Sequence, residues 1–144
     1  MTGNTRFAAS VHMLAYLAYR QGAAVPSAEI ASSVDTHPVV IRRLLSALVK
    51  ARLVTAQKGA AGGFSLAAAP EKISLRDIYH AVEPRPAHGL DNFAPNTKCP
   101  VGAKIHSILE GVFAKVQASM EAELARVTLA QIHQQLRPVC TGKH

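Results

Sequence analysis

The sequence has few acidic side chains and few cysteines. Its 144 residues include 16 Lys and Arg but only 9 Asp and Glu, for a formal net charge of +7. This excess favours a polyanionic partner, either nucleic acid or an anionic membrane surface. The two cysteines, Cys99 and Cys140, are too few for a disulfide framework or a four-cysteine zinc site within one chain.

Long hydrophobic runs and catalytic motifs are also missing. No run is long enough to span a bilayer, and the apolar stretch 7–19, which faintly resembles a signal peptide, is interrupted by His12 and two tyrosines. We therefore expect no membrane association and a cytoplasmic location. The sequence contains no nucleophile-elbow, metalloprotease or dinucleotide-binding pattern, so we expect that the protein is not an enzyme.

The breaks in helical periodicity predict a mainly helical fold with one small β-hairpin. The expected helices of the first part of the chain span residues 6–21, 26–34, 37–51 and 74–83. Ser27 is the expected cap of the second helix, and Ser74 with Asp77 forms a capping box at the fourth. Between the last two helices, segments 53–58 and 64–66 flank a glycine-rich turn and predict a hairpin. This order of elements is that of a winged helix-turn-helix domain over residues 1–83.

The third expected helix has one apolar and one basic face. At 100° per residue, its outward arc carries Val39, Arg42, Arg43, Ser46 and Lys50. No Asp or Glu occurs between Thr36 and Pro70, a stretch that also contains Arg52 and Lys58. We expect this stretch to bind DNA, because guanidinium groups suit guanine edges and a lysine in the wing suits a phosphate. The alternative is an ordinary solvated helix face.

Three glycines stand together in the expected wing. Gly59, Gly62 and Gly63 lack the Lys-Ser/Thr ending of a phosphate-binding loop, and no long helix follows them directly. They indicate a tight turn at the tip of the hairpin.

Beyond residue 83 the sequence changes character. Residues 84–99 contain prolines, Gly89, Asn92 and Asn96 and predict a linker. An apolar stripe at helical spacing then predicts one long helix over residues 100–136, followed by a tail over 137–144. Because such a stripe outside the first domain usually meets a second copy of itself, we expect a two-fold homodimer. The expected contact residues are Ile105, Ile108, Leu109, Val112, Phe113, Val116 and Met120.

Cys99 ends the linker and precedes Pro100, a residue favoured at the first position of a helix. The spacing predicts that its sulfur lies at the N-cap of the long helix beside Lys98, where both features lower the pKa of a thiol. A redox-sensing thiolate and a buried small hydrophobe both remain open here. Cys140 is a weaker redox candidate, as a resolving thiol. No pair of histidines has a helical metal-ligand spacing, and no metal site is predicted.

These motifs resemble the Rrf-two family of winged-helix transcription regulators, which includes IscR, NsrR and CymR. The resemblance is carried by segments 37–45, 53–54, 59–66 and 73–78, and the Cys-Pro-Val-Gly motif of residues 99–102 is similar to that of the YwnA-like branch. It covers about residues 5–136 and implies a homodimeric regulator, usually a repressor, bound to palindromic double-stranded DNA. The implied DNA contacts are Arg6, Ser27, His37, Val39, Val40, Arg42, Arg43, Lys58, Gly59, Gly62 and Gly63.

The chain departs from the iron–sulfur members of this family in its linker. Those members carry three cysteines there, whereas this linker has only Cys99. We therefore expect no cofactor, and oxidation of Cys99 or its reaction with an electrophile is the expected signal. The alternatives are an iron–sulfur cluster with mixed ligands from two subunits and a sensor of a small ligand. Two further alternatives are a thiol-based enzyme and a protein-interaction module whose long helix pairs with a different partner.

Overall fold

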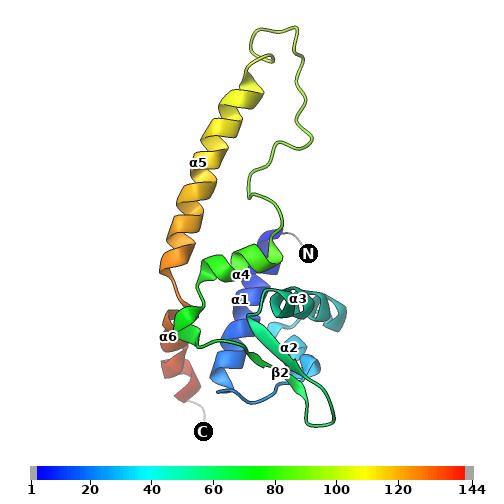
Figure 1. Ribbon diagram of the computed structural model, residues 1–144, viewed down its shortest axis with the longest axis vertical. Coiled ribbons are helices and arrows are strands. Elements are labelled where there is room, and N and C mark those ends of the chain that lie inside the picture. Colours follow the sequence, from blue (N-terminus) through cyan, green and yellow to red (C-terminus); the bar gives the residue numbers. More distant parts are fainter. Residues whose placement is uncertain (1–2, 142–144) are drawn as a thin grey trace.

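The computed structural model describes residues 3–141, without the side chains of residues 3–4 and 138–141. Within these residues the fold is mainly helical and has a two-stranded antiparallel hairpin, as predicted (Figure 1). The elements are α1 (Gly3–Tyr19), α2 (Ser27–Val34), α3 (Pro38–Lys50), β1 (Val54–Gln57), β2 (Gly63–Leu66), the 3-10 helix η1 (Pro70–Lys72), α4 (Leu75–Val82), α5 (Ile105–Arg126) and α6 (Leu129–Thr141). No helix in the described part of the chain is both long and apolar enough to cross a membrane.

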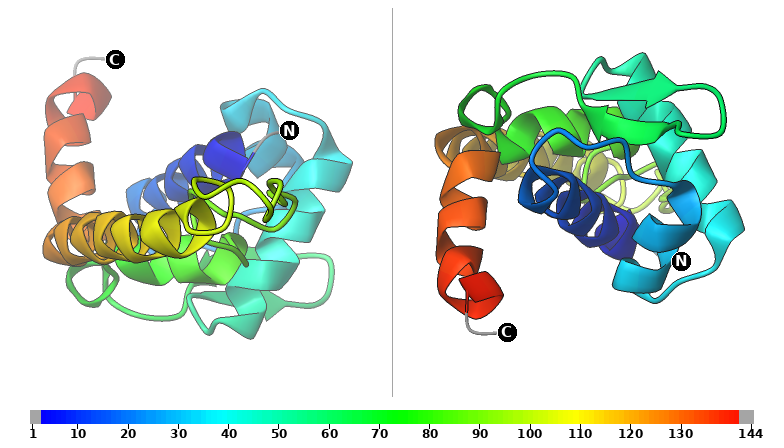
Figure 2. Two further views of the ribbon diagram at one scale, coloured as in Figure 1. Left: turned by 90° about the horizontal axis from the view of Figure 1, so that it is seen from above. Right: turned by 90° about the horizontal axis from the view of Figure 1, so that it is seen from below.

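The molecule consists of a head and a stalk. The head contains residues 3–83 and 127–141, and the stalk contains residues 84–126. From the end of α4, the linker (residues 84–104) runs to the far end of the molecule, and α5 returns from there to the head (Figure 1). The views along the long axis show α6 beside α1 and the hairpin beside α3 (Figure 2). The DNA-binding elements predicted from the sequence therefore lie in the head.

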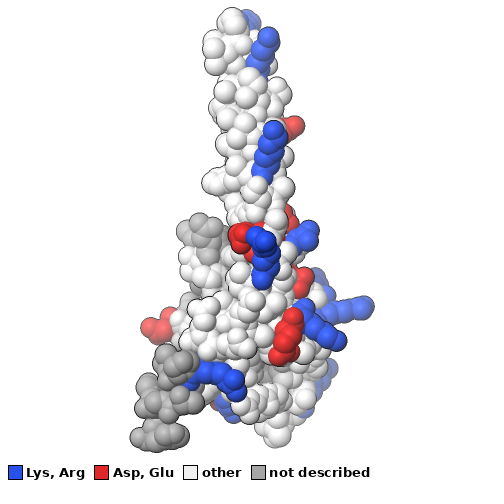
Figure 3. Space-filling view, turned by 90° about the vertical axis from the view of Figure 1, so that its left-hand side faces the viewer, with Lys and Arg blue, Asp and Glu red and all other residues white. Residues whose placement is uncertain are grey.

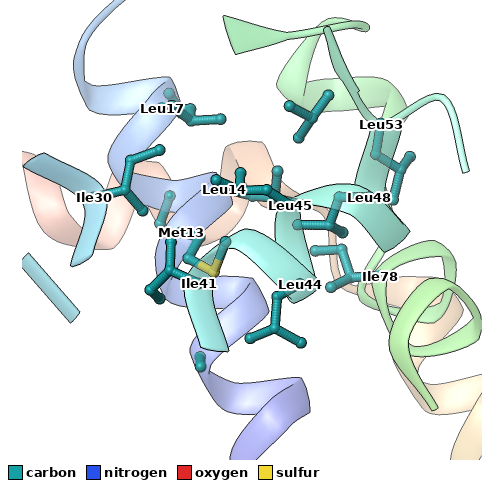
Figure 4. Close-up of a cluster of buried hydrophobic side chains, with 14 of the residues drawn as sticks. Met13, Leu14, Leu17, Ile30, Ile41, Leu44, Leu45, Leu48, Leu53 and Ile78 are labelled. Carbon is teal, nitrogen blue, oxygen red and sulfur yellow. The ribbon is translucent and has the colours of Figure 1, made fainter. Parts of the chain in front are cut away.

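The core of the head is built from the apolar faces of four helices. In Figure 4, Met13 and Leu14 of α1 lie against Leu45 of α3, with Ile30 of α2 and Ile78 of α4 completing the cluster. These side chains are 0–1% exposed. Burying an aliphatic side chain of this size contributes about 1.5–3 kcal/mol, so this cluster stabilises the head. The predicted apolar face of α3 is confirmed by its buried residues Ile41, Leu44, Leu45 and Leu48.

A capping box starts α4, whereas no side chain caps α2. At α4, Asp77 N–H donates to Ser74 Oγ at 3.1 Å, and Ser74 N–H donates to Asp77 Oδ2 at 3.0 Å, which confirms the predicted capping box. The prediction that Ser27 caps α2 is wrong. Pro26 occupies the N-cap, with an extended backbone at φ −62° and ψ 146°, and Ser27 is the first helical residue.

The prediction of one helix over residues 100–136 is wrong at both ends. Residues 99–104 form turns, and α5 begins only at Ile105. It ends at Arg126 because Val127 is extended and the chain there pairs with residues 73–75 at the start of α4. Leu75 N–H donates to Val127 O at 2.9 Å, and Leu129 N–H donates to Ile73 O at 2.8 Å. The predicted tail is also wrong, since α6 continues to Thr141.

A second capping box starts α6. Gln131 N–H donates to Thr128 Oγ1, and Thr128 N–H donates to Gln131 Oε1, both at 3.2 Å. The apolar period runs through this break, so periodicity alone did not reveal it. The sequence Thr128-Leu-Ala-Gln131 is the signal that predicts it.

Candidate nucleic-acid interface

The N-terminal end of α3 presents a face to the outside of the head. His37, Val39, Arg42 and Arg43 are exposed, and Val40 is half-buried. Val39 is 42% exposed, which leaves an apolar side chain beside the two guanidinium groups. This combination can contact both the guanine edge and the thymine methyl group in a major groove.

His37 also caps α3, a role that the sequence analysis missed. Its Nδ1 accepts a hydrogen bond from Val39 N–H at 3.1 Å. Asp35 and Thr36 precede it, but Asp35 is left-handed at φ 59° and ends α2 instead. Since Pro38 follows at the first helical position, the start of α3 is well defined. Histidine is not among the preferred caps, so propensity gives no signal for it.

The wing is positioned by a close approach of two backbones. Val25, just before α2, exchanges two hydrogen bonds with Phe64 of β2, at 2.9 and 2.8 Å. A Cβ atom at Gly63 would lie 2.6 Å from the Val25 carbonyl carbon, and one at Gly62 would lie 2.2 Å from the Gln57 oxygen. These two glycines are therefore required by space. The turn over residues 58–62 leaves Lys58 and Gly59 exposed at the hairpin tip.

The cations of this surface have no acidic partners in the part of the chain that the structure describes. None of the described ion pairs involves the five basic side chains between residues 36 and 70, all of which are exposed. They are Arg42, Arg43, Lys50, Arg52 and Lys58. Side chains without a carboxylate partner are available to neutralise phosphates.

The other two predicted DNA contacts, Arg6 and Ser27, lie elsewhere in the head. Arg6, near the start of α1, has its Nη2 3.5 Å from Oε2 of Glu83 at the end of α4. A phosphate would have to replace this carboxylate. Ser27 is half-buried in the first turn of α2.

Cys99 is exposed but does not lie at the N-cap of a helix, so that prediction is wrong. It begins a turn in which Ala103 N–H donates to Cys99 O at 2.9 Å. The backbone N–H groups of Gly102 and Val101 bond the sulfur and lower the pKa of the Cys99 thiol. Burial of the Cys99 side chain is thus the wrong alternative. The side chain of Cys140 lies outside the described residues.

Gly102 explains the Cys-Pro-Val-Gly motif in physical terms. A Cβ atom at Gly102 would lie 2.0 Å from the Asn96 carbonyl oxygen. The same oxygen accepts from Cys99 N–H at 3.2 Å, and Asn96 Oδ1 accepts from Lys98 N–H at 3.0 Å. The glycine thus lets the turn close around the cysteine.

The stalk leaves apolar side chains uncovered. In the described chain α5 has no buried residue, and Ile108, Val112 and Val116 are 57, 48 and 45% exposed. The other predicted contact residues are half-buried: Ile105, Leu109, Phe113 and Met120. The face of the stalk seen in Figure 3 is mostly uncharged, with a few basic side chains and an acidic one.

The chain is similar in sequence and in fold to known transcription regulators. The chain is 40% identical over 129 residues to the HTH-type transcriptional regulator YwnA of Bacillus subtilis (strain 168), covering 90% of this chain and 95% of YwnA. A crystal structure assigned to a DNA-binding protein has 38% identity and a TM-score of 0.71, with 88% and 97% of the two chains covered. IscR of T. potens has 26% identity and a TM-score of 0.66, with 91% and 85% covered.

The Rrf2 (Rrf-two) family model, described as an iron-dependent transcriptional regulator, matches residues 3–135. An iron centre does not fit the described residues of one chain, because no three His, Cys, Asp or Glu side chains among them converge on a point. The model nevertheless matches nearly the whole chain, and the winged helix, the exposed basic face and the resemblance to YwnA agree with it. The chain therefore belongs to the Rrf2 family of transcriptional regulators.

Proposed function

We propose that this protein is a cytoplasmic, homodimeric repressor that binds a palindromic DNA operator and is switched by oxidation of Cys99. It acts as a regulator and not as an enzyme. The observation that carries the proposal is the unpaired basic surface of α3 and the wing, over a stretch of chain without any acid.

DNA is bound by two elements of each head. α3 enters the major groove with its N-terminal end, where Arg42 and Arg43 contact base edges and Val39 contacts a thymine methyl group. Lys58 at the wing contacts a phosphate, or enters the minor groove. These two surfaces are shaped by His37, Val40, Gly59, Gly62 and Gly63. Beside them, Arg6 and Ser27 contact the sugar-phosphate backbone of the DNA.

Two copies associate through α5. The exposed stripe of Ile108, Val112 and Val116 lies at i, i+4 and i+8, which is one face of a helix. An apolar face of this kind is covered when it meets the same face of a second copy, which produces an isologous interface. A two-fold dimer presents two recognition helices in opposite senses, so its operator is a palindrome.

Cys99 provides the switch. Backbone N–H groups favour its thiolate, and this sulfur is exposed. The thiolate sulfur attacks one oxygen of a hydroperoxide, the O–O bond breaks, and the sulfur becomes a sulfenic acid while the other oxygen leaves as hydroxide or alkoxide and is protonated. The sulfur is oxidised by two electrons and the peroxide is reduced. The new oxygen disturbs the turn at the end of the stalk and thereby the relative orientation of the two heads.

The proposal is tested by titrating the DNA upstream of the protein's own gene, against scrambled DNA, at two salt concentrations. Reduced protein, peroxide-treated protein and Cys99→Ser are compared. We expect selective binding by reduced protein, a steep loss of affinity with salt, and a loss of binding after oxidation that Cys99→Ser does not show.

Three results would contradict parts of this proposal. Selective binding that is insensitive to oxidant removes Cys99 as the sensor. Selective binding by a monomer removes the dimer. Equal affinity for scrambled DNA and for every upstream fragment of the genome removes the repressor itself.

A further inference from the structure

We propose that the groove between the linker and α5 is an effector site for a neutral, planar aromatic molecule of one or two rings that carries a hydroxyl or carbonyl oxygen. The effect of the ligand on DNA binding rests on the proposed function, whereas the binding of the ligand to the groove does not. The groove has a volume of about 1090 Å³ and runs along the stalk from Arg85 to Phe93 on one wall and from His106 to Glu121 on the other. Ligand pockets of drug-sized molecules are typically about 300–1,000 Å³.

The walls of the groove are aromatic. Phe93 of the linker stacks on His106 of α5, with an interplanar angle of 12° and ring centroids 6.4 Å apart. His88 of the linker lies against Phe113 of α5, with ring centroids 5.8 Å apart. Phe93 is a large apolar side chain that is 40% exposed, so part of its ring remains available to a ligand. Both ring pairs bridge the linker and α5, so a flat molecule would stack on the exposed part of the Phe93 ring beside them.

The charges of the groove are already paired, which favours an uncharged ligand. Arg85 Nη1 bonds Asp91 Oδ2 at 3.1 Å, and His106 Nδ1 lies 3.8 Å from Glu110 Oε2. Glu121 is bound by His80 and Arg76 from α4. A charged ligand would have to break one of these pairs.

Hydrogen-bonding groups remain for the oxygen of the ligand. The side chains of His88 and Asn92 line the groove, and neither takes part in a hydrogen bond within the described residues. An imidazole and a carboxamide each donate and accept, so they suit a hydroxyl or a carbonyl group.

The groove stays open in the dimer proposed above. At 100° per residue, the groove-lining residues His106, Glu110 and Gln117 are centred about 140° around α5 from Ile108, Val112 and Val116. A partner copy seated on the apolar stripe therefore covers a different side of the helix. Ala114 and Ala118, which also line the groove, have small side chains that leave room for a ligand.

A ligand in the groove would touch the connection between stalk and head. Gln117 accepts from Ala87 N–H in the linker at 3.0 Å and donates to Tyr79 Oη of α4 at 3.1 Å. It also donates to Glu121 Oε2 at 2.9 Å. These bonds join the linker, α5 and α4 at the base of the groove. A ligand that changes the spacing of the walls therefore acts on α4 and on the head.

The binding test uses 2-naphthol and the full-length protein. Because the sequence has no tryptophan, fluorescence excited beyond tyrosine absorption comes from the probe. We expect saturable binding that Phe93→Ala and His106→Ala each weaken at least about tenfold, as expected for the loss of a stacking partner. Val101→Ala is the matched control, because Val101 is 67% exposed in the same linker and does not line the groove. It should retain wild-type affinity.

The groove site is overturned if 2-naphthol does not saturate the wild-type protein, or if both groove variants bind it as well as Val101→Ala does. Binding of the unrelated probe cyclohexanol with equal affinity would overturn the aromatic class. All three results are obtained without DNA, so they are independent of the proposed repressor function.

The effector role is tested on the operator that reduced protein binds. Saturating 2-naphthol should change the operator affinity of wild type and of Val101→Ala at least about fivefold. It should leave the operator affinity of Phe93→Ala unchanged. Unchanged affinity in wild type overturns the effector role. If the reduced protein has no operator at all, the proposed function fails while the binding test above still decides the groove.

Discussion

The head and the stalk use apolar residues in opposite ways. In the head, Ile41 and Leu45 of α3 are 0 and 1% exposed, and the chain closes this core by itself. In the stalk, the 22 residues of α5 include no buried one in the described chain, and Val112 remains 48% exposed. One chain therefore contains the contacts that stabilise its head, whereas the described chain leaves the apolar face of its stalk uncovered. Experiments that separate folding from association sharpen this comparison.

The largest effect is expected from opening a cavity in the head. Leu45→Ala removes a side chain that is 1% exposed and should lower the free energy of unfolding by about 2–5 kcal/mol. Urea unfolding at low protein concentration measures this change. Val116→Ala, in the exposed stripe of the stalk, should change it by less than about 0.5 kcal/mol under the same conditions. Equal losses in both variants would contradict the division into head and stalk.

A charge in the apolar stripe of the stalk should weaken the proposed dimer without unfolding the head. Val112→Asp places a charge in the middle of the proposed interface, twice per dimer, and should raise the dimer dissociation constant at least about 100-fold, which is about 3 kcal/mol. Sedimentation measures the dissociation constant, and circular dichroism should show an intact head. Ser107→Asp is the control, because Ser107 is exposed on a different side of α5. A dimer that tolerates Val112→Asp does not use this face.

Within the head, substitutions in α3 and in the wing should affect DNA binding in different ways. Arg43→Ala should weaken operator binding by about 1–3 kcal/mol and relax selectivity at one base pair, if the guanidinium bonds a guanine on two atoms. Lys58→Ala should instead weaken all sequences alike and reduce the slope of log affinity against log salt by about 0.9. Titrations of operator and scrambled DNA at several salt concentrations measure both. Unchanged selectivity in Arg43→Ala would remove it from the base contacts.

The smallest effect concerns the junction of head and stalk. Hydrogen bonds from Gln117, and then from His80, lower the pKa of Glu121 below its ordinary value of 4.5. Its contribution to stability is therefore present above the ordinary pKa and is lost as the pH falls through the lowered one. Between pH 5 and 3, wild type should lose more stability than Glu121→Gln in urea unfolding. Glu123→Gln, at an exposed ion pair with Arg126 on the same helix, should follow the wild type.

Most of the head could be predicted from the sequence, because its helices follow from apolar spacing and caps formed by residues close together along the chain. The buried face of α3 and the capping box of Ser74 each depend on residues within one turn of a helix. The pair of Arg6 and Glu83 joins α1 to the end of α4, and no local pattern indicates it. The DNA-contacting roles of Arg6 and of the exposed residues of α3 and the wing remain predictions.

The stalk could be predicted less well, for a physical reason. Its apolar spacing continues through the break at Val127, where hydrogen bonds to the segment before α4 end the helix. Pro100 suits the start of a helix, but Gly102 and the Asn96 oxygen close a turn there instead. Both departures come from contacts between segments distant along the chain or from backbone space, which propensities do not report.

Both legs of the stalk are attached to α4. The linker leaves from its C-terminal end, and residues 127–129 are bonded to the segment at its N-terminal end. At 1.5 Å per residue, the 8 residues of α4 are about 12 Å long and the 22 residues of α5 about 33 Å. If stalk and α4 tilt as one body, a displacement of about 3 Å at the Cys99 end becomes about 1 Å at α4, by the ratio of those lengths. A stalk that tilts in this way would act as a reducing lever, because a movement of its tip would reach the packed helices of the head at about a third of its size.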